Sequence, residues 1–148
     1  MNTQISPQLV EAAIAWAEQT VQGSTGRPLT KEEATMAAKV GVKHTELIQI
    51  CIGPVPMPQE DPLRTAVLNL GLGNPEGLAI GYSLFLKRGP KGQNDILFLH
   101  ECAHLVQFGE SGGRLRPFIE EYLGQLLKDG YLHSKWEVEA RRMGGITF

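Results

Sequence analysis

Cysteine is scarce in this 148-residue chain, which contains only Cys51 and Cys102. One pair cannot form the disulfide framework of a small secreted domain, so we expect two reduced and buried thiols. No uninterrupted apolar run approaches the roughly 20 residues that a spanning helix needs. Residues 1–16 lack the basic stretch, apolar core and cleavage site of a secretory signal. These absences predict a cytoplasmic protein with no membrane partner.

Long runs of one charge sign are also missing. The formal net charge is −2, and the charged residues, 20% of the chain, mix both signs. Bulk electrostatics therefore gives no reason to expect a nucleic-acid partner. Hydrophobic residues make up 42% of the chain, which is enough for one core without disulfides or structural metal. We therefore expect a single domain over residues 1–148.

The N-terminal third of the chain has the pattern of two helices. Ser6 is a typical N-cap before a proline, and apolar residues at helical spacing predict a helix over residues 7–22. Thr30 and Glu33 form a capping-box pattern that opens a second helix, which ends near Val40.

Two stretches have the composition of β-strands. Residues 46–52 (ELIQICI) mix β-branched residues with alternating polarity, and residues 77–89 (GLAIGYSLFLKRG) form the second expected strand. Between them, residues 53–62 contain four prolines, which predicts a loop or an extended crossing. The residues that follow, up to Gly71, suit a short helix.

The rest of the chain is predicted to be helical. Three helices are expected. The first is capped by Asn94 or Asp95 and runs through Phe108, with Gly109 at its end. The second runs from Pro117 to about Lys128 and is stopped by Asp129-Gly130, and the third is capped by Ser134 and runs into Arg142. The predicted fold class is α+β, mostly helical with a small β-sheet beside the histidine helix. Residues 1–45 are its N-terminal helical part, and residues 46–148 hold the sheet and the metal-site helices.

A His-Glu-x-x-His motif lies within the apolar segment LFLHECAHLVQF, residues 97–108. Four residues advance an α-helix by about 400°, so His100 and His104 project from one face, one turn apart. Their imidazoles can meet at one Zn²⁺, and Glu101 can act as the base that activates water. Burying these groups among apolar neighbours without a partner would cost several kcal/mol, which favours a metal site over a chance match.

Two other polar residues of this segment have different expected places. Cys102 lies about 200° around the helix from His100 and is expected in the core. Gln107 returns to the face of the two histidines, where it either hydrogen-bonds near the site or faces solvent.

A catalytic zinc usually has three protein ligands, so a third Asp, Glu or His is needed. Candidates without supporting context are Glu110, Glu120, Glu121 and His133. Glu110 has the metzincin spacing, but that pattern requires glycine where Gln107 stands. Glu137 is favoured, because Ala140 lies on nearly the same helix face and lets this helix approach the histidines.

A competing role for Glu137 stays open. Ser134 and Glu137 have capping-box spacing, and Arg141, one turn later, could pair with the same carboxylate. Glu139 would then become the third ligand. The two glutamates face nearly opposite ways on a helix, so only one of them can bind the ion.

These motifs resemble those of bacterial zincin-like domains of unknown function and, more generally, of minimal glutamate-type zinc metallopeptidases. The similar segments are HECAHLVQF, RPFIEEYLGQLLKDGY and WEVEA, preceded by GRPLTKEEATMAAKVGVKH, PVPMPQEDP and GLAIGYSLFLKRG, which together cover most of the chain. The resemblance implies that Glu137 is the third zinc ligand. It also implies a strand such as residues 79–87 (AIGYSLFLK) beside the site, which either holds an extended substrate by backbone pairing or is plain sheet core. The chain departs from several peptidase relatives at Arg141, where they have an aspartate that orients the first histidine.

Motif and resemblance together predict a zinc-dependent metallopeptidase or peptidase-like hydrolase with a peptide or protein substrate. In this hypothesis His100, His104 and Glu137 bind Zn²⁺ and Glu101 is the catalytic base. The expected donors to the substrate oxyanion are His133, Tyr131 or Tyr82. The alternative is a non-catalytic zincin-fold protein that binds metal or regulates a partner, because a small chain leaves little room for a deep cleft. A helical interaction module without metal is the third interpretation.

Overall fold

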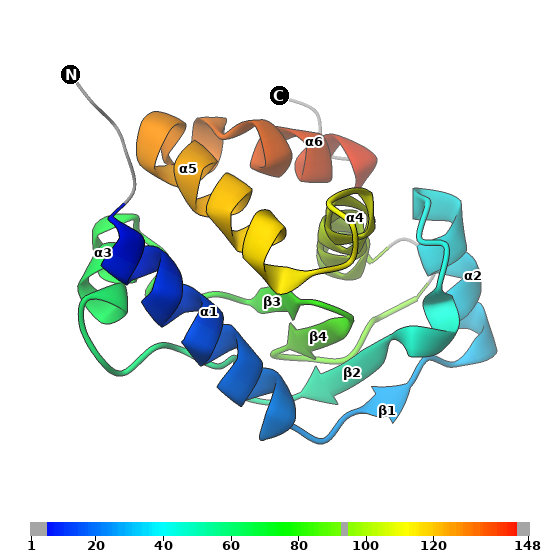
Figure 1. Ribbon diagram of the computed structural model, residues 1–148. Helices are drawn as coiled ribbons and strands as arrows, with labels where there is room; N and C mark the ends of the chain where they lie inside the picture. The colour runs from blue at the N-terminus through cyan, green and yellow to red at the C-terminus, as the bar shows by residue number, and fades with distance from the viewer. Residues whose placement is uncertain (1–5, 93–94, 145–148) are drawn as a thin grey trace.

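The computed structural model describes residues 6–92 and 95–144 of the chain. In chain order its elements are α1 (Pro7–Gln22), β1 (Arg27–Pro28), α2 (Lys31–Val40), the 3₁₀ turn η1 (Thr45–Leu47), β2 (Gln49–Ile52), α3 (Leu63–Asn69), β3 (Gly77–Ile80), β4 (Ser83–Leu86), α4 (Ile96–Glu110), α5 (Leu115–His133) and α6 (Lys135–Met143). Helices predominate around one small sheet, which confirms the predicted α+β class. Figure 1 shows α4 above the sheet, with α6 above α4 and α5 beside α4.

The two N-terminal helices begin as predicted. The Ser6 hydroxyl accepts a hydrogen bond from the backbone N–H of Leu9 at the start of α1. At the start of α2, Thr30 and Glu33 form both hydrogen bonds of a capping box. Glu33 also pairs with Arg27 at 2.8 Å, which links α2 to the short strand β1 that the sequence did not indicate.

The strand predictions are partly wrong. Within residues 46–52, only the last four form a strand, β2, because the chain first makes the 3₁₀ turn η1. Residues 77–89 form a hairpin instead of one strand: β3 and β4 pair antiparallel across a turn at Gly81. Gly81 has φ +61°, a left-handed conformation that glycine adopts without the steric cost that other residues meet.

The sheet has the strand order β1-β2-β4-β3. β2 and β4 are parallel, while β1 and β3 each pair antiparallel with their single neighbour. The parallel pair requires a crossing between β2 and β4. Residues 53–76, which include α3, lead from β2 to the far edge of the sheet, and β3 then turns back into β4. β3 therefore lies at the edge of the sheet.

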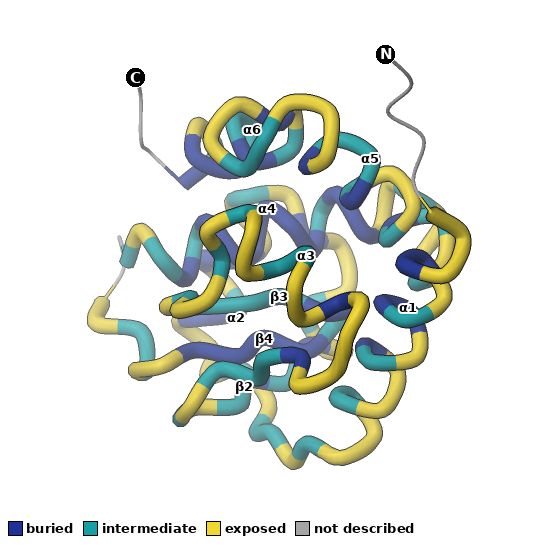
Figure 2. The backbone as a smooth tube through the Cα atoms, turned by 90° about the vertical axis from the view of Figure 1, so that its left-hand side faces the viewer, coloured by how far each residue is buried: buried dark blue, intermediate teal, exposed yellow. Residues whose placement is uncertain are grey.

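Helix α4 packs on the sheet through its apolar face. The core between them includes Phe98, Cys102 and Leu105 from α4 and Ile50, Leu84 and Leu86 from the strands. Figure 2 shows that α4 and β4 are largely buried. This core fixes α4 with its opposite face directed toward α5 and α6.

The ends of α4 differ in part from the prediction. Asp95 caps its start, accepting from the backbone N–H of Phe98 at 2.9 Å, whereas the alternative cap Asn94 lies outside the described residues. The helix runs past the predicted end at Phe108 and includes Gly109. Its last residue is Glu110, and Ser111 caps it before two glycines with positive φ that turn the chain into α5.

Helix α5 starts two residues before Pro117 and contains a kink. Gly130, predicted to stop the helix, has non-helical φ +75° and ψ 168°, and the last turn then continues to His133. α6 follows immediately after Ser134. The kink turns Tyr131 and the start of α6 back toward α4.

The described residues agree only in part with the expectation for the two cysteines. Both are free thiols, Cys102 fully buried in α4 and Cys51 half-buried in β2. Burial raises the pKa of Cys102 well above its usual range, as expected for a packing residue. No helix that the structure describes is long and apolar enough to cross a membrane.

Candidate metal centre

His100 and His104 lie side by side on the face of α4 that is turned away from the sheet. Their ring centroids are 4.9 Å apart, and the residues are 8% and 7% exposed. The helical spacing alone produces this arrangement, as predicted from the motif.

Glu137 of α6 meets both histidines. Its Oε1 lies 3.0 Å from His100 Nε2 and its Oε2 lies 3.1 Å from His104 Nε2. The carboxylate is completely buried. The ligand atoms of the three residues all lie within 4.8 Å of one another, so two imidazoles and one carboxylate converge on one place.

Small residues let α6 come this close to α4. Ala140 is fully buried, as expected from its predicted role in this helix approach. Gly144 at the end of α6 was not recognised from the sequence. A Cβ at this position would lie 3.3 Å from the backbone nitrogen of His100, so glycine permits the contact.

The competing capping role of Glu137 is wrong. The Ser134 side chain makes no capping hydrogen bond to α6, and its hydroxyl contacts the carbonyl of Tyr131 instead. Arg141 donates from Nη2 to the carbonyl of Leu132. Glu139 accepts a hydrogen bond from Gln107. The structure thus brings Glu137 to the histidines and leaves Glu139 beside them.

The other candidate ligands lie apart from this cluster. Glu110, Glu120, Glu121 and His133 are all exposed. Among the described residues, no second group of three or more His, Cys, Asp or Glu side chains has its ligand atoms so close together.

Gln107 ties His104 to α6. Its amide nitrogen donates to the carbonyl of Trp136 at 3.0 Å and to Glu139 Oε1 at 3.1 Å, and its Oε1 lies 2.8 Å from His104 Nδ1. Both partners of the nitrogen are acceptors, so the amide oxygen must face the histidine. His104 Nδ1 therefore carries a proton, which leaves Nε2 as the nitrogen that can bind a metal. Of the two expected places for Gln107, the buried one beside the site is confirmed.

Tyr122 of α5 completes the surroundings of Glu137 and was not recognised as a site residue from the sequence. Its hydroxyl donates to Glu137 Oε2, and its ring packs edge-on against His104. Burial raises the pKa of Tyr122 well above its usual range, with the Glu137 charge acting in the same direction. Tyr122 therefore stays neutral and donates a hydrogen bond to the carboxylate.

Electrostatics keep Glu137 ionised. Burial opposes its ionisation, but hydrogen bonds from His100, His104 and Tyr122 hold the pKa of Glu137 well below its usual range. Burial also favours neutral His104, yet the Glu137 carboxylate more than compensates and raises the pKa of His104 to about 9. The cluster thus presents an anionic oxygen ligand between two imidazoles.

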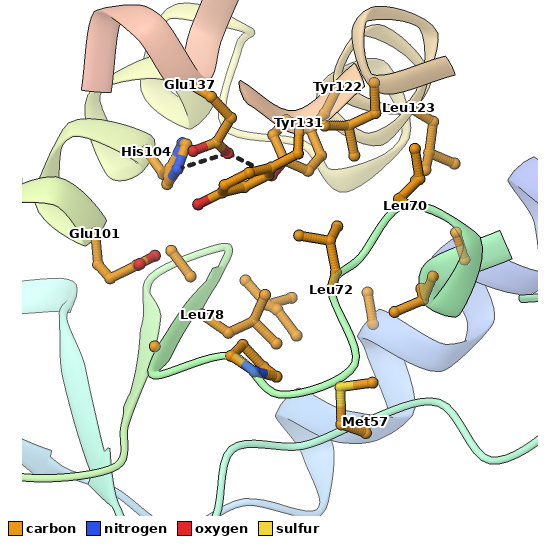
Figure 3. A pocket seen from close by; sticks show the side chains of 18 of the residues that line it. Met57, Leu70, Leu72, Leu78, Glu101, His104, Tyr122, Leu123, Tyr131 and Glu137 are labelled. Carbon is orange, nitrogen blue, oxygen red and sulfur yellow. Dashed lines mark hydrogen bonds and ion pairs between the residues drawn. The ribbon is translucent and has the colours of Figure 1, made fainter. Parts of the chain in front are cut away.

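Glu101 faces the same space from the next position of α4. It is 6% exposed, and burial raises the pKa of its carboxyl group despite the nearby histidines. Gly77 at the start of β3 makes room for it, because a Cβ there would lie 3.2 Å from Glu101 Cγ. Figure 3 shows the Glu101 carboxylate across an open space from Tyr131 and Glu137.

That space is a cavity of about 820 Å³. His100, Glu101, His104 and Glu137 line it, together with α1, α3, α5 and β3. The expectation that a small chain leaves little room for a cleft is therefore wrong. The crossing between β2 and β4, through α3, supplies a wall that sequence patterns did not indicate.

One of the three suggested oxyanion donors lines this cavity. Tyr131 does so, immediately after the Gly130 kink, while Tyr82 and His133 do not. Tyr82 instead packs edge-on against Phe108, with ring centroids 5.4 Å apart. Burial raises the pKa of Tyr131 above its usual range, so its hydroxyl is a donor at neutral pH.

The donor set fits Zn²⁺. Two imidazole nitrogens and one carboxylate oxygen are its usual ligands in catalytic sites, where a fourth position is left for water or substrate. Gln107 holds His104 through Nδ1 and Tyr122 holds Glu137 through Oε2, as expected of residues that support a metal site.

No protein-family model matches the chain, and no curated protein or solved structure matches it either. The resemblance to zincin-like domains therefore stays an expectation from the motifs. A functional assignment depends on the chemistry of the site itself.

Proposed function

We propose that this protein is a zinc-dependent metallopeptidase or peptidase-like hydrolase, a minimal glutamate-type zincin in the sense that its motifs imply. One observation carries the proposal. His100, His104 and Glu137 converge at the wall of a cavity that Glu101 also faces. A purely structural metal site would have no need of a second buried carboxylate, in addition to Glu137, beside a substrate-sized space.

The side chains divide the chemistry between them. When bound, Zn²⁺ would lower the pKa of a water molecule and polarise the carbonyl group of the peptide bond to be cleaved. Glu101 accepts a proton from the attacking water and delivers it to the amine that leaves. Burial raises the pKa of Glu101, and an upward shift favours a carboxylate that must both take up and release a proton.

Two tyrosines have separate roles in this proposal. Tyr131 lines the cavity with Glu101 and donates a hydrogen bond to the oxyanion that forms on the substrate. Tyr122 donates a hydrogen bond to Glu137 Oε2 and so restrains this ligand.

Metal content tests the ligand set. Protein purified without a histidine tag is expected to contain one zinc per chain by elemental analysis. Glu137→Ala should lose the metal, whereas Glu139→Ala, two residues away on the same helix, should keep it. Zinc retained by Glu137→Ala and lost from Glu139→Ala would contradict the assignment.

Cleavage of a denatured protein substrate, followed by mass spectrometry, tests the reaction. Glu101→Gln should retain zinc and lose activity by about 100-fold or more, the usual contribution of a general base. Full activity in this variant would rule out the mechanism. Zinc in both proteins with cleavage by neither would instead support the non-catalytic alternative, a zincin-fold metal-binding or regulatory protein.

A further inference from the structure

The wall of the cavity opposite His100, His104 and Glu137 is apolar. It comes from the crossing between β2 and β3 and from α5, and includes Met57, Leu63, Leu70, Leu72, Leu123 and Leu126. Figure 3 shows Met57, Leu70 and Leu72 facing the space from the side opposite His104 and Glu137. A substrate bound at the site of His100, His104 and Glu137 thus extends over leucine and methionine side chains.

The cavity is large enough to hold several side chains. A benzene-sized group fits an apolar cavity of about 150 Å³, and this one measures about 820 Å³. Leu70 and Leu72 are only half-buried, so each keeps apolar surface that a ligand can cover. Covering such surface is favourable because it removes it from water.

The edge of the sheet indicates what kind of molecule enters. All four residues of β3 line the cavity, and β3 pairs only with β4 among the described residues. The backbone groups on its other side are available to an extended chain with its own N–H and C=O groups. A peptide satisfies them, whereas an acyl chain has no polar groups to offer.

We propose that this cavity selects peptides with large apolar side chains next to the bond that is cleaved, and that Leu70 and Leu72 determine this specificity. The inference rests on the proposed hydrolase function, since it names the substrate class of the same site. It is separable from that function, because apolar selection is measured by binding without turnover.

The test uses zinc-loaded Glu101→Gln protein and fluorescence anisotropy. The probes are two dansyl-hexapeptide amides that differ only at their central pair, Leu-Leu or Asn-Asn, because Asn and Leu are similar in size. The Leu-Leu peptide should bind at least about tenfold more tightly, the effect of burying one or two apolar side chains. Adding Leu72→Asn should reduce this preference to about threefold or less.

Leu68→Asn is the matched control. Leu68 lies in α3, just before Leu70 and Leu72, is 48% exposed, and does not line the cavity, so its replacement should leave the preference unchanged. Leu70→Asn is a second cavity variant in case Leu72→Asn unfolds, and thermal unfolding of each protein checks this. Equal binding of the two peptides, or equal effects of Leu68→Asn and Leu72→Asn, would overturn the inference.

Two further arms separate the possible failures. If dansyl-undecanoic acid binds in a Leu72-dependent way and neither peptide binds, the cavity takes acyl chains and the inference is wrong. If wild-type protein cleaves peptides without preferring leucine, the hydrolase proposal stands and the inference fails. If leucine-selective binding occurs without any cleavage, the inference stands and the hydrolase proposal fails.

Discussion

At the scale of single residues, Gln107 does the work that a carboxylate or carbonyl usually does behind a metal-binding histidine. It is 1% exposed and contacts both His104 and the carbonyl of Trp136, the residue before Glu137. One amide therefore sets the tautomer of one ligand and the position of the helix that carries another. Arg141, at the position where the motif resemblance implies an orienting aspartate, need not supply this function.

We expect Gln107→Leu to weaken zinc binding by about 10- to 100-fold, the usual effect of losing a residue that supports a ligand. Competition with a chromophoric zinc chelator measures the affinity. Gln125→Leu is the control, because Gln125 also bonds to α6, accepting from the Trp136 N–H at 2.8 Å, yet contacts neither histidine. Both variants lose a helix contact, but only Gln107→Leu should lose zinc affinity; equal losses would show that Gln107 acts through packing alone.

At the scale of elements, predictions from the sequence succeeded where the determining signal is local. Ser6, Thr30 and Asp95 each cap a helix within three residues of their own position, and each was recognisable as a cap. Residues 77–89 indicated one strand instead of the β3–β4 hairpin, because an apolar run with a central glycine fits either a single strand or a hairpin. Strand pairing depends on distant residues, and no local pattern reports it.

The same distinction explains how the site was predicted. His100, Glu101 and His104 follow from helical spacing within one element. The choice of Glu137 over Glu139 depends on how α6 packs on α4, which no local pattern reports. In the structure Ser134 makes no capping hydrogen bond, and the Glu137 carboxylate contacts both histidines. Tyr122 reaches Glu137 from a third helix, and its role had no signal beyond a tyrosine in an amphipathic segment.

The kink in α5 leads to a prediction at this scale. Gly130 has φ +75° and ψ 168°, a region in which only glycine is stable, so Gly130→Ala should lower the free energy of unfolding by about 1–3 kcal/mol. Cleavage should fall further than stability explains, because Tyr131 is the next residue. Urea unfolding and peptide cleavage measure the two effects.

Gly109→Ala provides the matched substitution. Gly109 is exposed and helical in α4, with no atom within 4 Å of an added Cβ. Alanine there should raise the free energy of unfolding by about 0.5 kcal/mol, because it restricts the unfolded chain and favours the helix. A Gly130→Ala protein as stable as Gly109→Ala would show that the kink is not required.

At the scale of the whole molecule, the candidate metal site and the main core lie on opposite faces of α4. The core of Phe98, Cys102 and Leu105 against the strands contains none of the ligands. Without metal, the close polar contacts of Glu137 with the two histidines still hold α6 to α4. The fold therefore does not depend on zinc in the way that a zinc finger does, and metal should add stability to a chain that is already folded.

Zinc titration of the apo protein tests this relation. Because the ion binds the folded chain, the free energy of unfolding should rise by about 2.7 kcal/mol when free zinc is 100 times its dissociation constant. Circular dichroism should show the same helix content before and after EDTA treatment, with a lower melting temperature after it. Glu137→Ala should remove the zinc dependence, since two imidazoles alone do not complete the donor set. Loss of helix content with EDTA would contradict a metal-independent core, and zinc dependence kept by Glu137→Ala would place the ion elsewhere.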